Sequence, residues 1–333
     1  MLRMLQEREY SAIAEKYKSI VEQRFAALKG NRKEPRFVYE PISYALGTGG
    51  KRIRSVMVLL ACEAVGGSPR SALDAAVAVE LLHNFTLVHD DVMDNAVLRR
   101  GQPTVCKKWN RDVAILSGDE LLAIAYRFLL KTKSPHLARI LGVFTDAFVE
   151  VCEGQGFDKE FERLKDVTSG DYLMMVRKKT GRLISAATEI GGLIGNGAAR
   201  EISALRRFGE LLGIAFQIMD DVLDIAGDEE EFGKTIGGDI VEGKKTYLLV
   251  KSRERVKGAD RKLLLKVIPG NTMDRKTIRR ILEIYRREHV LDDARDEIGR
   301  NTRLAEKELA VVKPGNAKST LLWLSKRLLA RSS

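Results

Sequence analysis

Apolar residues recur along most of the chain at intervals of three and four, the spacing that gathers them on one face of an α-helix. Strict alternation of period two is nearly absent, and all seven prolines fall where a helical pattern starts or stops. We therefore expect an all-α chain and, because no linker divides it, a single domain over residues 1–333. The pattern predicts helices over 5–28, 52–65, 71–95, 112–131, 136–153, 198–226, 272–289 and 316–330.

Two of the predicted helices are apolar almost all round, as expected for helices in the middle of a bundle. They run from Leu73 to Val92 and from Phe208 to Ile225. Each one ends in an aspartate-rich motif. The motifs are DDVMD, which holds Asp90, Asp91 and Asp94, and DDVLD, which holds Asp220, Asp221 and Asp224.

The two motifs point to a bound cation. The first and fifth residues of each motif share a helical face, where like charges repel, and the C-terminal end of a helix already carries about half a negative charge. Oxygen ligands suit Mg²⁺, which completes its shell with water and substrate phosphate. One such motif alone is more often a solvated acidic helix end, but two copies on apolar helices favour a metal site.

Basic residues form several short groups along the chain, and two of these groups follow the aspartate motifs. Each of them alone is more often a surface charge than a ligand. Their number predicts two polyanions, one bound through metal and one mainly through Lys and Arg. They are Lys51 and Arg54 at a helix start, Arg99 and Arg100 after the first motif, Lys178 and Lys179 at a break between helical stretches, and Lys234 and Lys244 after the second motif.

Composition narrows the class of protein only slightly. The 333 residues, 44% hydrophobic and 31% charged, fit a globular protein with one large core. Cys62, Cys106 and Cys152 are scattered without CxxC spacing, so we expect neither a disulfide framework nor a zinc site, and a reducing cytosol fits best. No signal peptide and no transmembrane segment is expected.

The net charge of +11 raises the question of nucleic-acid binding. Residues 251–333 hold 22 Lys and Arg against 11 Asp and Glu, so all of the excess lies in the last quarter of the chain. That region reads as amphipathic helices with dispersed charge and few aromatic residues. We therefore favour solvated helix faces over a nucleic-acid or membrane surface.

An ordered set of motifs resembles a known family. GGKRIR, HDDVMD, RRGQPT, KKTG, FQIMDDVLD and EGKKT, at these spacings, resemble the trans-isoprenyl diphosphate synthases from about Pro41 to the C-terminal helices. With two residues between its second and third aspartates, the first motif is most similar to the archaeal-type geranylgeranyl, or bifunctional farnesyl/geranylgeranyl, diphosphate synthases. The resemblance implies the isoprenoid synthase fold, a large helical bundle around a deep central cavity with the two motifs facing each other. It also implies a homodimer, in line with the cytoplasmic location expected from the cysteines.

The resemblance also implies a role for each matching residue. Isopentenyl diphosphate is expected on Gly50, Lys51, Arg54, His83 and Arg100. The allylic diphosphate is expected on Arg99, Lys179, Thr180, Gln217, Lys234 and Lys244. About three Mg²⁺ ions are expected, with Asp90, Asp94 and Asp220 as direct ligands. Asp91, Asp221 and Asp224 would orient the metals or their waters, with Asp239 acting through water.

The implied reaction is a step of isoprenoid biosynthesis. Isopentenyl diphosphate condenses head to tail with dimethylallyl, geranyl or farnesyl diphosphate by Mg²⁺-assisted ionisation, condensation and proton elimination. Phe85, five residues before Asp90, would form the floor of the chain pocket, with the smaller Thr86 beside it and Leu82 below. Geranylgeranyl diphosphate is then the expected main product, although Phe85 fits core packing as well.

Several alternatives remain at this point. Farnesyl diphosphate could be the main product, and a terpene cyclase or a squalene-type synthase would share part of the motif set. A regulatory subunit without catalytic activity is a further class, which the intact motifs disfavour. Two positions depart from the family, since Cys106 and Ser55 stand where many relatives have His and Pro.

Overall fold

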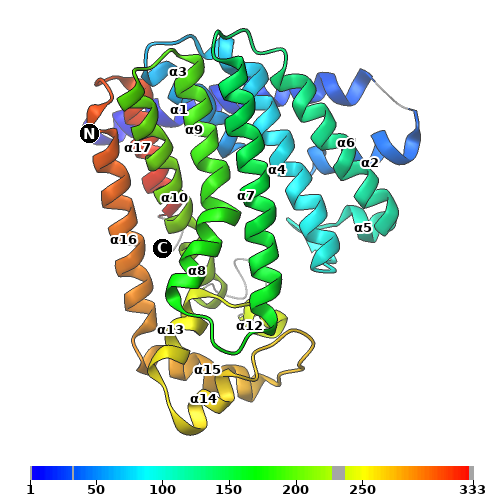
Figure 1. Ribbon diagram of the computed structural model, residues 1–333, viewed down its shortest axis with the longest axis vertical. Helices are drawn as coiled ribbons and strands as arrows, with labels where there is room; N and C mark the ends of the chain where they lie inside the picture. Colours follow the sequence, from blue (N-terminus) through cyan, green and yellow to red (C-terminus); the bar gives the residue numbers. More distant parts are fainter. Residues whose placement is uncertain (1, 32–33, 227–236, 330–333) are drawn as a thin grey trace. The chain divides into compact units, whose positions relative to one another are not determined.

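The computed structural model describes residues 2–31, 34–226 and 237–329, and it is built almost wholly of helices (Figure 1). Within these residues the strands are β1 (Leu98–Arg99) and β2 (Gln102–Pro103), which pair antiparallel in a short hairpin. The expected all-α fold class is therefore confirmed. The chain divides into two compact units, and a single domain over residues 1–333 stays a prediction.

Unit 1 comprises Met1–Phe148, Ala186–Arg206 and Val311–Trp323. Its central helix is α4, which packs against α3 and α6 and keeps Ala75–Val79 at 0% exposure. Its elements are α1 (Leu2–Asn31), α2 (Arg36–Gly47), α3 (Ile53–Ala64), η1 (Pro69–Ala72), α4 (Leu73–Met93), β1, β2, α5 (Val105–Lys108), α6 (Arg111–Leu129) and parts of α7 (Leu137–Arg163), α9 (Arg182–Ile194), α10 (Ala199–Ala226) and α17 (Asn316–Leu329).

Unit 2 comprises Val149–Ser185, Arg207–Ala310 and Leu324–Ser333. Several of its helices begin at a side chain that accepts a backbone N–H, as Thr168, Thr246 and Asp274 do. Besides the remaining parts of the shared helices, it contains α8 (Ser169–Val176), η2 (Arg177–Gly181), α12 (Gly238–Glu242), α13 (Tyr247–Arg255), α14 (Gly258–Leu264), α15 (Arg275–Arg287), α16 (Val290–Glu308) and most of η3 (Leu309–Val311).

The structure corrects three details of the predicted helices. Pro41 lies inside α2, although every proline was expected at the start or end of a helical pattern. Lys178 and Lys179 do not lie at a break, because the π-helix η2 joins α8 to α9. A π-turn adds a residue to the helix and shifts the phase of the apolar pattern, so the sequence pattern indicates a break although the helix continues. Finally, the predicted ranges did not include α2, α5, α8, α9, α12, α13, α14 and α16.

One helical stretch of the described chain is long and apolar enough to cross a membrane. It runs over Pro69–Met93, and 67% of its apolar window is buried inside the structure. Because a buried core helix passes the same test of length and composition, this stretch is only weak evidence for a membrane span.

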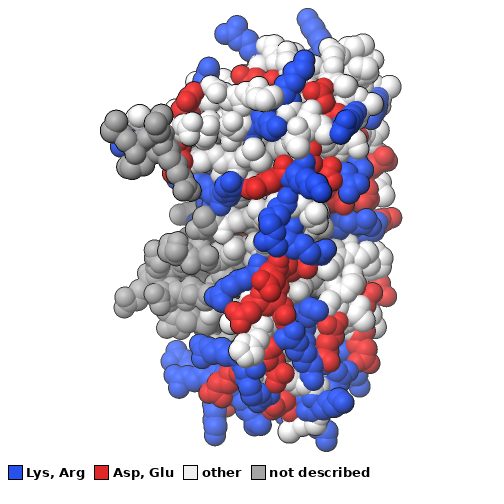
Figure 2. Space-filling model, turned by 90° about the vertical axis from the view of Figure 1, so that its left-hand side faces the viewer, with Lys and Arg blue, Asp and Glu red and all other residues white. Residues whose placement is uncertain are grey.

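The surplus of positive charge is visible on unit 2. Figure 2 shows Lys and Arg side chains gathered at the end of the unit that carries α14 and α15. Lys262, Lys266, Lys276 and Arg279 are exposed there, while Ile281, Ile284 and Tyr285 bury the apolar face of α15. The expected solvated basic face of an amphipathic helix is therefore present.

Candidate active site

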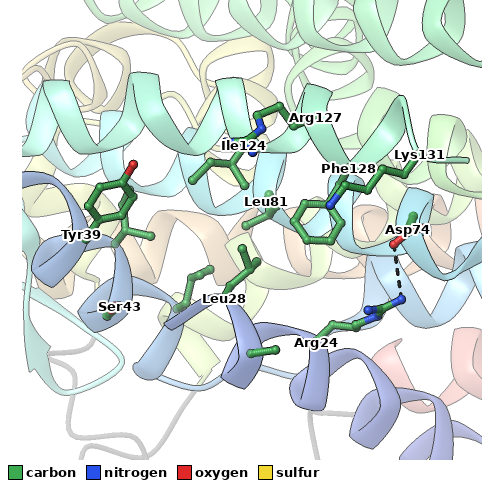
Figure 3. Close-up of a pocket in the computed structure, with 13 residues that line it drawn as sticks. Arg24, Leu28, Tyr39, Ser43, Asp74, Leu81, Ile124, Arg127, Phe128 and Lys131 are labelled. Carbon is green, nitrogen blue, oxygen red and sulfur yellow. Dashed lines mark ion pairs between the residues drawn. The ribbon is translucent and has the colours of Figure 1, made fainter. Parts of the chain in front are cut away.

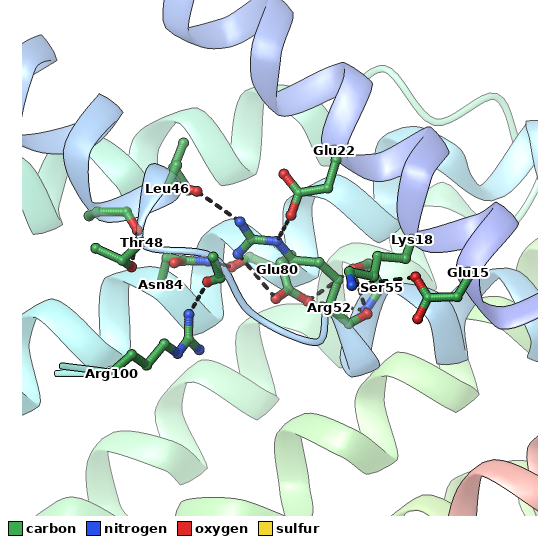
Figure 4. Close-up of polar contacts among 12 residues, drawn as sticks. Glu15, Lys18, Glu22, Leu46, Thr48, Arg52, Ser55, Glu80, Asn84 and Arg100 are labelled. Atoms are coloured by element: carbon green, nitrogen blue, oxygen red, sulfur yellow. Dashed lines mark hydrogen bonds and ion pairs between the residues drawn. The ribbon is translucent and has the colours of Figure 1, made fainter. Parts of the chain in front are cut away.

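The loop before α3 is fixed by a buried arginine in unit 1. Arg52, at φ 50° and 2% exposure, donates through Nε to Glu22 Oε1 at 2.6 Å and through Nη2 to the Leu46 carbonyl at 2.8 Å (Figure 4). Its Nη1 also lies 3.7 Å from Glu80 Oε1. Arg52 therefore anchors the loop, a role that the sequence pattern gave no signal for.

The other residues of this loop surround a second arginine. Arg100, in the β1–β2 turn, donates through Nη1 to the carbonyl of Gly49. Gly50 has φ +150°, and a Cβ built there would lie 2.8 Å from Arg100 Nη1. Glycine at this position thus lets the backbone and the guanidinium approach each other. Lys51, the next residue, is exposed.

His83 stands within a group of arginines. Its Nε2 lies 3.1 Å from Arg54 Nη1. Burial, together with the charges of Arg54, Arg100, Arg99 and Arg52, holds the pKa of His83 well below its usual value. The ring is therefore neutral near pH 7, and Nε2 accepts the hydrogen bond from Arg54. Such a concentration of guanidinium groups favours an anion.

The first aspartate motif divides into buried and accessible carboxylates. Asp91, 4% exposed, accepts from Arg99 Nε at 2.8 Å, and Arg99 Nη2 lies 2.7 Å from the same oxygen. Burial raises the pKa of Asp91 although Arg99 opposes the shift. Asp90 is partly exposed and Asp94, at the C-cap of α4, is exposed. Asp91 thus positions Arg99, while the two outer carboxylates stay accessible.

The second motif, in unit 2, divides in the same way. Asp221, 5% exposed, accepts through Oδ2 from the Tyr172 hydroxyl at 2.6 Å and from the Tyr247 N–H at 2.8 Å. Gln217 Nε2 lies 3.3 Å from its other oxygen. Burial, and secondarily the charge of Asp239, raises the pKa of Asp221 to about 7. Neither tyrosine could be found from the sequence, since nothing in their spacing relates them to the motif.

The outer carboxylates of the second motif are partly exposed. Asp224 Oδ2 accepts from the Asp239 N–H at 3.0 Å, and Asp220 is partly exposed one residue before Asp221. Lys244 Nζ lies 3.4 Å from Asp239 Oδ1 and 2.5 Å from Glu242 Oε2. Lys234 lies outside the described residues.

Two glycines bring η2 close to its neighbours in unit 2. A Cβ on Gly154 of α7 would meet Lys179 N at 2.4 Å, and one on Gly213 of α10 would meet Gly181 Cα at 2.5 Å. This close packing lets Thr180 Oγ1 donate to Gln217 Oε1 at 2.9 Å. Lys179 Nζ pairs with Asp158 Oδ2 at 2.6 Å. Thr180, Gln217 and Asp221 thus form one hydrogen-bonded chain.

The predicted chain-length residues lie on α4 in unit 1. Phe85 is 7% exposed, and its ring lies 4.5 Å from that of His89 and 5.4 Å from that of Phe148. Leu82 is fully buried, and Thr86 donates through Oγ1 to the His83 carbonyl at 2.8 Å. Phe85 is thus held by aromatic neighbours, a packing that suits a fixed wall.

The carboxylates fit a Mg²⁺ site in which the substrate supplies some of the ligands. No three His, Cys, Asp or Glu side chains of the described residues converge closely enough to hold an ion by themselves. Each motif instead offers outer carboxylates at a helix end beside a buried partner. This pattern suits Mg²⁺, which takes one or two carboxylates and fills its remaining positions with water and phosphate.

A family model described as polyprenyl synthetase matches residues 35–285. The chain belongs to the polyprenyl synthetase family. The "Short chain isoprenyl diphosphate synthase" of Methanothermobacter thermautotrophicus is 38% identical over 298 residues, which cover 89% of this chain and 91% of that protein. The "Geranylgeranyl diphosphate synthase" of Saccharolobus solfataricus is 38% identical over 299 residues, which cover 88% and 90%.

A solved structure of another family member supports the same assignment. The geranylgeranyl pyrophosphate synthetase of Pyrococcus horikoshii superposes with a TM-score of 0.92 at 36% identity, covering 98% of this chain and 99% of that one. This likeness confirms the expected polyprenyl synthetase fold. It also confirms the resemblance drawn from the ordered motifs.

Proposed function

We propose that this protein is a trans-prenyltransferase that extends allylic diphosphates with isopentenyl diphosphate and makes geranylgeranyl diphosphate as its main product. Family membership and the relatives' names support the reaction class. The observation that carries the proposal is the parallel build of the two motifs. Asp91 and Asp221 are buried and hydrogen-bonded, while the carboxylates beside them are accessible.

Isopentenyl diphosphate binds to the basic group of unit 1 in this proposal. Gly50, Lys51, Arg54, His83 and Arg100 contribute to its site. Because the pKa of His83 is lowered, its neutral ring directs Arg54 without adding a competing positive charge. The guanidinium groups then hold the diphosphate by charge-assisted hydrogen bonds.

The allylic diphosphate binds to a second set of groups. When bound by Asp90, Asp94 and Asp220, Mg²⁺ supplies positive charge beside the diphosphate leaving group. Asp91 orients Arg99, and the chain from Thr180 through Gln217 to Asp221 fixes the polar groups of unit 2. Arg99, Lys179, Thr180, Gln217, Lys234 and Lys244 are the proposed contacts.

The chemistry requires stabilisation of charge and exclusion of water. Cleavage of the allylic C–O bond puts negative charge on the diphosphate and leaves a carbocation, which the double bond of isopentenyl diphosphate attacks. The proton lost from the new chain passes to the released diphosphate. Apolar residues near the site keep water from the carbocation.

Chain length is set by Phe85 in this proposal. Its ring lies about 7–8 Å along the helix axis from Asp90, five residues away. Thr86 is smaller than an aromatic residue and leaves space beside it, which supports a product longer than farnesyl diphosphate. We further propose about three Mg²⁺ ions per site, a cytoplasmic homodimer and no role in nucleic-acid binding.

Removal of the accessible carboxylates tests the proposal. Asp90→Ala and Asp220→Ala should each lower kcat by at least a hundredfold with the fold retained, because charge stabilisation at the leaving group is lost. Asp146→Ala removes an exposed aspartate from α7 and is the matched control. Full activity of either motif variant, or of the parent in excess EDTA, would contradict the proposal.

A further inference from the structure

A cavity of about 320 Å³ lies in unit 1, and its lining includes none of the residues assigned to the proposed reaction. It is formed by α1, α2, α4 and α6 (Figure 3). The lining residues that α4 contributes are Asp74 and Leu81. Leu81 precedes Asp90 by nine residues, which is about 13–14 Å along the helix axis. The cavity therefore belongs to another part of α4 than the aspartate motif does.

The inner wall of the cavity is apolar. Leu46 and Leu81 are 1% and 0% exposed, and Ile42, Ile124 and Phe128 are at most 8% exposed. Two hydroxyl groups interrupt this wall, those of Tyr39 and Ser43, and Tyr39 donates to Glu120 at 3.2 Å. A volume of this size lies at the lower end of small-molecule sites, so the wall can enclose a short hydrocarbon chain.

The rim of the cavity is positively charged. Arg24, Arg127 and Lys131 line it, together with a single carboxylate, Asp74. Arg24 Nη2 lies 3.7 Å from Asp74 Oδ1, and the two side chains are 50% and 26% exposed, so solvent weakens that pair. Lys131 Nζ lies over the Phe128 ring at 4.5 Å. Within the described chain, Arg127 and Lys131 form no ion pair with a carboxylate.

We propose that this cavity binds an amphiphilic anion, with its hydrocarbon chain on the apolar wall and its phosphate or carboxylate head on Arg127 and Lys131. An apolar pocket with a few convergent polar groups is the usual form of such a site. Arg127 and Lys131 line the cavity and are exposed, so the head bound to them lies at the mouth, where it stays partly hydrated. Prenyl phosphates and straight-chain lipid phosphates share this chemistry. The proposal does not depend on the reaction proposed above.

The rim is tested by calorimetric titration of the full-length protein with decyl phosphate, geranyl phosphate and the uncharged geraniol. The double variant Arg127→Glu and Lys131→Glu should weaken binding of both phosphates at this site at least tenfold. The control Lys133→Glu makes the same charge change at an exposed lysine outside the cavity. We expect it to bind both phosphates as the parent does, and geraniol to bind at least tenfold more weakly than geranyl phosphate.

The wall is tested by Ser43→Trp, which fills the cavity without changing its charge and should abolish binding at this site. Circular dichroism and prenyl transfer activity report whether each variant is folded. A tenfold preference for geranyl phosphate over decyl phosphate identifies the isoprenoid as the better ligand, and equal affinity identifies amphiphilic phosphates in general. The proposal would be overturned if the rim variant or Ser43→Trp bound the phosphates with unchanged affinity. It would also be overturned if Lys133→Glu lost as much phosphate affinity as the rim variant does.

Discussion

Tyr172 offers a direct way to perturb the second aspartate motif without touching a proposed metal ligand. Its hydroxyl donates to Asp221 Oδ2 at 2.6 Å inside the protein and so lowers the pKa of that carboxyl. Tyr172→Phe removes the hydroxyl and keeps the ring. The charged form of Asp221 should then be less stable, and the pKa, already about 7, should rise further.

The size of the effect follows from the strength of the lost bond. A hydrogen bond to a charged group contributes about 1.5–3 kcal/mol, which corresponds to a rise of about one to two in the pKa of Asp221. If Mg²⁺ binds only when Asp221 is ionised, protons compete with the metal. The half-saturating Mg²⁺ concentration at pH 7 should then rise about 5- to 50-fold. At pH 9 the difference should shrink to about twofold at most.

The assay is the prenyl transfer rate as a function of Mg²⁺ concentration at pH 7 and pH 9. Tyr247→Phe is the matched control, because its ring packs 5.7 Å from that of Tyr172 while only its backbone N–H donates to Asp221. We expect the control to keep the Mg²⁺ dependence of the parent. An unchanged Mg²⁺ requirement in Tyr172→Phe, or a loss equally large at both pH values, would refute this reasoning.

Three further results are expected. Because its pKa is raised, Asp221 binds more protons in the folded than in the unfolded state, so in EDTA the stability should fall as pH rises from about 4 to about 7. The melting temperature of Asp221→Asn should lack this fall between pH 4 and pH 7. Gly50→Ala should raise the KM for isopentenyl diphosphate more than Gly49→Ala does, because both glycines have positive φ but only a Cβ on Gly50 would meet the Arg100 side chain; equal KM values would contradict this. Phe85→Ser should give products beyond twenty carbons, whereas Phe148→Ser should not; an unchanged product with lower stability would assign Phe85 to packing.

The sequence predicted those parts of the fold that depend on local pattern. The apolar character of α4 and α10 and the charged motif at the end of each could be read directly, because burial on all sides leaves few polar positions. The helix through Lys178 and Lys179 was misread, since the π-turn shifts the apolar pattern while the backbone stays helical. Local periodicity records such a shift as a break.

Contacts between distant segments could not be read from the sequence. Arg52 pairs with Glu22 thirty residues away, and Tyr172 donates to Asp221 forty-nine residues away. Glu22 and Tyr172 belong to no motif, and only the packing of helices brings them to Arg52 and Asp221. The structure was also needed to show that one carboxylate of each motif is buried and the other two are accessible. The sequence does not distinguish Asp91, which is buried on Arg99, from the aspartates beside it.

The most direct test of the proposed function is chromatography of the dephosphorylated products formed from labelled isopentenyl diphosphate and each allylic diphosphate. With Mg²⁺ present, we expect geranylgeraniol as the main labelled alcohol from dimethylallyl, geranyl and farnesyl diphosphate alike, and no labelled alcohol in excess EDTA. Farnesol as the main product would contradict the assigned chain length. The absence of any extended alcohol with Mg²⁺ would contradict the central claim that this protein elongates prenyl chains.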